Sequence, residues 1–104
     1  MTTENIEIEK VKSKVPKWFR YRQNQINSQI LLSFLKLNEL NNIVTIEMLE
    51  QECNLKTFKS NFQQMCNFSE KNNAKIFTKF ETKICLWDKV EKFILDEYQK
   101  SKIL

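Results

Sequence analysis

The side chains best suited to chemistry lie in one window of the chain, residues 54–83. This window holds six lysines and two acids, a net charge of +4. The whole chain also has a formal net charge of +4, so the remaining residues balance to zero. Ammonium groups can bind phosphate, and the amides and hydroxyls among them can hydrogen-bond to base edges. Such a local concentration of cations is typical of a surface that contacts a polyanion.

Within this window, residues 56–71 have the spacing of a helix with two unlike faces. Phe58, Phe62 and Met65 recur at helical spacing and predict a buried stripe. The opposite face carries Lys, Gln, Asn and Ser and no acid, and these side chains can read or hold a DNA groove. We therefore predict contact with double-stranded DNA through this helix and the basic segment after it. The predicted DNA-binding residues are Lys56, Lys59, Ser60, Gln63, Gln64, Asn67, Lys71, Lys75, Lys79 and Lys83.

A simpler interpretation of these residues also stands. An ordinary solvated helix face typically includes glutamates as well as lysines, and residues 46–53 carry three glutamates. Lysines on strands commonly serve to block edge-to-edge aggregation, which accounts for Lys75 and Lys79 equally well. The acid-free helix face is the feature that favours DNA.

A second group of cations lies nearer the amino terminus. Lys17, Arg20 and Arg22 alternate with three aromatic residues in the segment after Pro16. Two interpretations stay open. In the first, the aromatic residues pack across the core and the cations remain in water. In the second, the segment is an arm that contacts DNA phosphates or stacks on bases.

The segment before Pro16 has a different character. Residues 1–15 are polar and show no sustained helical period, so we predict a mobile tail there and a folded domain over residues 16–104.

Local signals predict the elements that must position these residues. Thr45 and Thr57 are suited to cap helices, and Asp88 with Glu91 has the spacing of a capping box. The chain has no Gly, so Asn is expected wherever the backbone needs a positive φ. The predicted order is a helix over 27–37 with an Asn cap, a strand over 43–45, helices over 46–53 and from 58, strands over 74–80 and 83–87, and a last helix after 88.

This order predicts a mainly α protein with a small β-hairpin, an α+β fold. It resembles the winged helix-turn-helix fold, on the spacing of Thr45-Ile46-Glu47-Met48-Leu49, Phe58-Lys59-Ser60-Asn61-Phe62 and the following hairpin. The resemblance implies a three-helix core, a wing and a carboxy-terminal helix. It further implies that the third helix enters the major groove and that the wing contacts the DNA backbone.

Several function classes find no support in the sequence. The chain has no His, no Gly-rich phosphate loop and no Cys beside a base, so we predict that it is not an enzyme and takes no small-molecule substrate. Three widely spaced cysteines lack metal-site spacing, so no metal or cofactor is expected. The absence of a signal peptide or membrane span predicts an intracellular protein, in the cytoplasm or nucleus, with no membrane partner.

Two further interpretations stay open beside a small DNA regulator or DNA-contacting subunit. One is a winged-helix protein-interaction module in a larger assembly or a homodimer, docking through an aromatic patch. The other is an RNA-binding module, which shares the charge but lacks a close aromatic platform. The candidate docking patch is Trp18, Phe19, Tyr21, Phe77 and Phe80.

Overall fold

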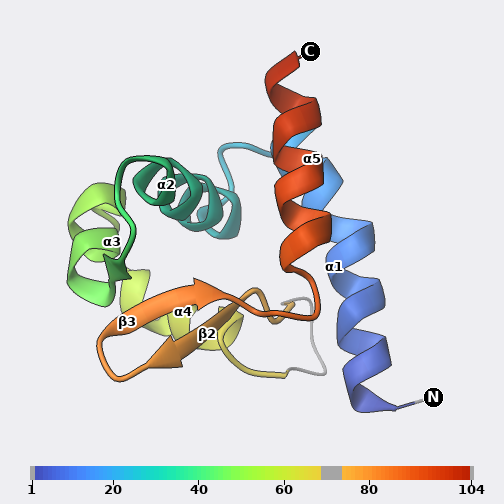
Figure 1. Ribbon diagram of the computed structural model, residues 1–104, viewed down its shortest axis with the longest axis horizontal. Helices are drawn as coiled ribbons and strands as arrows, with labels where there is room; N and C mark the ends of the chain where they lie inside the picture. Colours follow the sequence, from blue (N-terminus) through green and yellow to red (C-terminus); the bar gives the residue numbers. More distant parts are fainter. Residues whose placement is uncertain (1, 69–73, 104) are drawn as a thin grey trace.

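The described part of the chain comprises residues 2–68 and 74–103 of a computed structural model, and it forms five helices and three strands. Figure 1 shows α1 and α5 side by side along one edge, with α2, α3, α4 and the sheet beside them. The elements are α1 (Thr3–Arg20), α2 (Ile26–Leu40), β1 (Val44–Thr45), α3 (Ile46–Cys53), α4 (Phe58–Met65), β2 (Phe77–Phe80), β3 (Lys83–Leu86) and α5 (Glu91–Ile103).

The three strands form one antiparallel sheet in the order β1-β3-β2. Val44 pairs with Ile84, and Phe77 pairs with Leu86, which places four buried apolar side chains on the sheet's inner face. The predicted hairpin is confirmed, although β2 begins at Phe77 and residues 74–76 precede it. At the turn, Glu81 takes a positive φ of 59°, a position where Asn was expected.

The helix pair α3–α4 follows its local signals closely. The Thr45 hydroxyl accepts a hydrogen bond from the Met48 N–H at 3.2 Å and caps α3 as predicted. Asn54 ends α3 in the left-handed conformation, with φ 51°, as expected of Asn in a chain without Gly. Thr57 takes the N-cap position of α4, but its hydroxyl makes no cap hydrogen bond.

The prediction of a tail over residues 1–15 is wrong. Residues 3–20 form α1, which begins where the Thr2 hydroxyl accepts a hydrogen bond from the Asn5 N–H at 3.1 Å. Val11 and Val15 are fully buried, and α1 lies against α5. Pro16 lies inside the helix, not at its start. The burial of Val11 and Val15 stabilises α1 and offsets the loss of the backbone hydrogen bond that Pro16 cannot donate.

Two other helix starts differ from prediction. Helix α2 begins at Ile26 behind Gln25, which makes no side-chain cap bond, so neither Asn24 nor Asn27 caps it. Helix α5 begins at Glu91, and residues 88–90 form a turn closed by a hydrogen bond from the Val90 N–H to the Trp87 carbonyl at 3.0 Å. The predicted capping box therefore does not open α5.

The core beneath α4 is aromatic. Phe77 from the sheet lies 5.2 Å from Phe34 of α2 and 5.3 Å from Phe62 of α4, measured between ring centroids. Phe58 stacks on Phe62 at 5.3 Å. These contacts fix the inner face of α4, and its other face is therefore turned to solvent. Within residues 2–68 and 74–103, every helix is too short or too polar to cross a bilayer.

Candidate nucleic-acid interface

The outward face of α4 carries the amides and the hydroxyl that were predicted for it from the sequence. Ser60, Gln63, Gln64 and Asn67 are exposed, and together with Phe68 they line a shallow hollow of about 390 Å³. None of the described residues that line this hollow is an acid. The side chains that the prediction grouped on one face are therefore brought together.

The helix is shorter than the predicted span of residues 56–71. It ends at Met65, where the Cys66 N–H donates to the Gln63 carbonyl at 3.1 Å. Asn67 lies beyond the helix, but its side-chain amide donates to the same Gln63 carbonyl at 2.8 Å. This bond keeps Asn67 beside the helix face. Lys71 lies outside the described residues.

The amino-terminal end of α4 is cationic. Lys56 and Lys59 are exposed there, and the first turn contains no acid. Neither lysine joins an ion pair within the described residues. The helix dipole adds partial positive charge at this end, so the site favours an anion.

Lys75 has a structural role that the sequence did not reveal. It precedes β2, so the prediction that it lies in a strand with Phe77 is wrong. Its ammonium lies 5.4 Å from the ring centroid of Phe68 and 5.5 Å from that of Trp87. The side chain is half-buried, and these cation–π contacts anchor it next to the α4 hollow, which Phe68 also lines.

The two hairpin lysines are exposed on opposite faces of the sheet. Lys79 pairs with Ile84, whereas Lys83 pairs with Phe80, which is 61% exposed. Neither lysine joins an ion pair within residues 2–68 and 74–103. Both ammonium groups are therefore available to phosphates.

Cys66 shows how close the hairpin charges lie to the end of α4. Burial raises the pKa of its thiol to about 11, and the ammonium groups of Lys79 and Lys75 act in the opposite direction. In both views the hairpin and α4 lie at the same end of the molecule, with α4 behind the sheet in Figure 1. The lysines and the helix face thus belong to one end of the protein.

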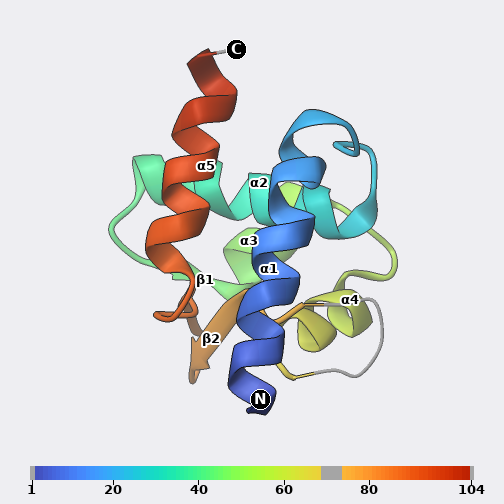
Figure 2. The same cartoon turned by 90° about the vertical axis from the view of Figure 1, so that its right-hand side faces the viewer.

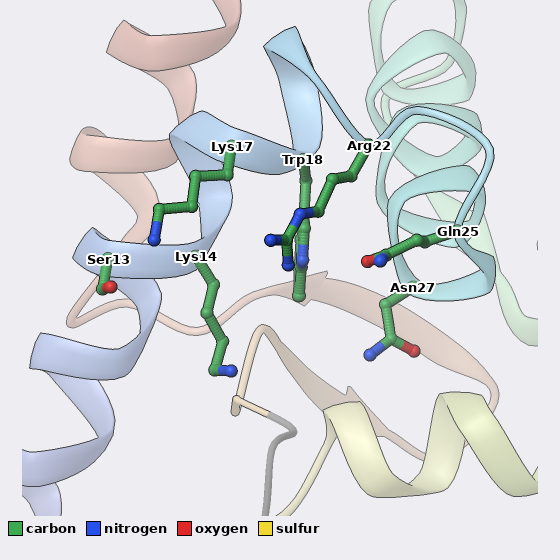
Figure 3. A pocket seen from close by; sticks show the side chains of 7 residues that line it. All are labelled: Ser13, Lys14, Lys17, Trp18, Arg22, Gln25 and Asn27. Carbon is green, nitrogen blue, oxygen red and sulfur yellow. The ribbon is translucent and has the colours of Figure 1, made fainter.

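The structure separates the three cations of the predicted arm. Arg20 points toward α5, where its Nη2 lies 3.7 Å from Oε2 of Glu97. Lys17 and Arg22 instead line a second hollow with Lys14 (Figure 3). Lys14 was missed because α1 was not predicted; on a helix, its spacing of three from Lys17 places both on one side.

The described ranges contain no group of three or more His, Cys, Asp or Glu side chains that could hold a metal ion.

Comparisons with protein-family models, with curated proteins and with solved structures find no match to this chain.

Proposed function

We propose that the protein binds double-stranded DNA through the outward face of α4, as a small regulator or as the DNA-contacting part of a larger complex. The observation that carries the proposal is the composition of that face. Residues 56–68 contain two lysines, exposed amides and no acid, and the lysines have no carboxylate partner in the described residues. Helix α3, by contrast, carries three glutamates.

The arrangement of the elements supports a winged helix-turn-helix. Helix α2 is followed by β1, the pair α3–α4 and the hairpin β2–β3, and the strand order is β1-β3-β2. Residues 54–57 join α3 to α4, a connection of the length typical of a helix-turn-helix. In such a protein the second helix of the pair enters the major groove.

The dimensions of α4 suit this role. Its eight residues extend over about 12 Å at roughly 1.5 Å per residue. The major groove of B-DNA is about 12 Å wide and admits one α-helix. Gln63 and Gln64 are exposed near the carboxy-terminal end of α4, where they can reach base edges, and Lys56 and Lys59 at its amino-terminal end can reach phosphates.

The salt dependence of binding to a fluorescein-labelled duplex, followed by anisotropy, tests the proposal. If Lys56, Lys59, Lys79 and Lys83 each neutralise one phosphate, the log–log salt slope is about −4. Replacing Lys79 or Lys83 with Ala should flatten the slope by about one unit. Lys92 on α5, exposed and without an ion pair in the described ranges, is the matched control and should leave the slope unchanged. A slope equally sensitive to Lys92 would contradict the proposal.

Most residues of the predicted protein-docking aromatic patch are buried. Trp18, Phe19 and Phe77 are buried in the core, with exposed fractions of 4%, 2% and 0%. Only Tyr21 and Phe80 of the five are exposed. The predicted patch therefore does not exist as a surface, because these aromatic side chains hold the helices and the sheet together.

A further inference from the structure

A hollow of about 380 Å³ lies between the carboxy-terminal half of α1 and the first turn of α2, and none of its described lining residues belongs to α4. Figure 3 shows side chains from both helices and from their connection around a common space. Of the lining residues that the structure describes, three are cations and none is an acid. The lining residues are Ser13, Lys14, Lys17, Trp18, Arg22, Gln25 and Asn27.

Backbone hydrogen bonds hold the connection that carries Arg22. The N–H groups of Tyr21 and Arg22 both donate to the Lys17 carbonyl, at 2.8 and 3.0 Å. The Gln25 N–H donates to the Arg22 carbonyl at 3.1 Å, and the side-chain amide of Gln23 donates to the Phe19 carbonyl at 2.6 Å. The turn therefore fixes the position of Arg22 relative to both helices.

The electrostatics of the hollow favour an anion. Within the described residues, Lys14, Lys17 and Arg22 join no ion pair. Three like charges that line one hollow repel one another, and a bound anion offsets this repulsion. The first turn of α2 contributes in the same sense, because it has no acid and the helix dipole adds partial positive charge at this end.

We propose that this hollow is a phosphate-binding site. Arg22 supplies a planar fork of donors that matches two phosphate oxygens, and Lys14 and Lys17 supply point charges beside it. Gln25 and Ser13 add neutral hydrogen-bonding groups, and Trp18, 4% exposed, forms an apolar wall. The proposal stands on these residues and does not depend on DNA binding by α4.

The phosphate can belong to a small phosphorylated molecule or to the backbone of a nucleic acid. Figure 2 shows α4 and the connection between α1 and α2 on the same side of the molecule. A duplex lying on α4 can therefore approach the hollow. Both sources present the same oxygens to Lys14, Lys17 and Arg22.

Titration of ¹⁵N-labelled protein with inorganic phosphate tests the site. The two indole N–H signals are separate reporters, since Trp18 lines the hollow and Trp87 lies 5.6 Å from Phe68 between ring centroids. We expect saturable shifts of the Trp18 indole and of the first amides of α2, with Trp87 unchanged. Sodium chloride at equal ionic strength should not reproduce them. Shifts that fail to saturate, or that chloride reproduces, would overturn the proposal.

Variants identify the residues that hold the phosphate. Arg22→Gln and Lys14→Gln should each weaken phosphate binding about tenfold, since each removes a charge-assisted hydrogen bond. Lys12→Gln makes the same charge change on an exposed residue of α1 that does not line the hollow, and it should change the affinity less than twofold. Unchanged affinity in folded Arg22→Gln and Lys14→Gln would also overturn the site.

A duplex without terminal phosphates distinguishes the two sources. If it displaces inorganic phosphate from the hollow, the site takes a backbone phosphodiester. If it leaves the Trp18 signal of the phosphate complex unchanged, the site takes a small phosphorylated molecule. Either result supports the site, and the phosphate titration remains valid even if α4 binds no DNA.

Discussion

The carboxylate of Glu7 accepts a hydrogen bond from the backbone N–H of Lys75 at 3.2 Å, across 68 positions of the chain. Its other oxygen lies 2.8 Å from the ammonium of Lys10. Glu7 is only 1% exposed. This buried carboxylate joins α1 to the segment that leads into the hairpin. It thereby helps to position the Lys75 backbone, from which the side chain reaches the rings of Phe68 and Trp87.

Glu7→Ala should destabilise the protein by about 2–3 kcal/mol, because it leaves the Lys75 N–H without its acceptor and removes the Glu7–Lys10 ion pair. Urea unfolding followed by circular dichroism measures this loss. Glu9→Ala removes an exposed carboxylate from the same helix and should cost less than about 0.5 kcal/mol. Equal losses in the two variants would show that the Glu7 contacts do not stabilise the fold.

Lys75 and Lys79 should respond differently to the same substitution. Lys75→Ala removes the cation from the rings of Phe68 and Trp87 and should cost about 1 kcal/mol of stability. Lys79→Ala should change stability by less than about 0.5 kcal/mol, because Lys79 is exposed and makes no ion pair in the described residues. Thermal unfolding of the two variants checks this; the reverse order of stabilities would contradict the assigned role of Lys75.

Ser28→Ala should stabilise the protein. Ser28 is fully buried in the first turn of α2, and its hydroxyl has no hydrogen-bond partner among the described residues. Alanine removes this unsatisfied group and is the better helix former, so we expect a gain of about 1 kcal/mol in the free energy of unfolding. Ser33→Ala, on a half-buried position of the same helix, is the comparison. A loss of stability in Ser28→Ala would mean that the hydroxyl is satisfied.

The raised pKa of the Cys66 thiol predicts that the stability of the protein falls at high pH. Its pKa in the folded state is about 11, above the ordinary value of 9.0, so folding favours the protonated thiol. This contribution is complete below pH 9 and is lost as the pH rises toward 11. The stability difference between the wild type and Cys66→Ala should therefore shrink by about 1 kcal/mol between pH 8 and pH 10. A difference that is constant over this range would contradict the burial of the thiol.

The sequence predicted the elements whose boundaries depend on neighbouring residues. The Thr45 cap, the left-handed Asn54 and the apolar spacing of Phe58 and Phe62 define α3 and the start of α4 within a few positions. The position of the hairpin turn, at residues 81–82, was also predicted from the sequence. Boundaries that depend on tertiary contacts were not predicted: α4 ends at Met65, where the backbone turns toward the hairpin and the Ile76 N–H donates to the Met65 carbonyl at 2.7 Å.

Helix α1 illustrates what the sequence concealed. Ile8, Val11 and Val15 have helical spacing, and this signal was present. The segment before Pro16 is otherwise polar, so no sustained helical period was recognised there, and Glu7 proved to be buried despite its charge. Two contacts account for that burial: the ion pair with Lys10, and the hydrogen bond from the Lys75 N–H, which joins distant parts of the chain. The hollow around Lys14 depends on α1 and was missed with it.

Chemical-shift mapping of ¹⁵N-labelled protein with an unlabelled DNA duplex tests the central claim most directly. We expect the largest shifts on Ser60, Gln63 and Gln64 of α4, with smaller shifts at the hairpin lysines and none along α5. Gln63→Ala should then change the sequence preference at one base pair by about 1–3 kcal/mol. Shifts confined to α5, or no shifts at a salt concentration of about 50 mM where phosphate contacts are strong, would contradict the assignment of α4 as the DNA-binding surface.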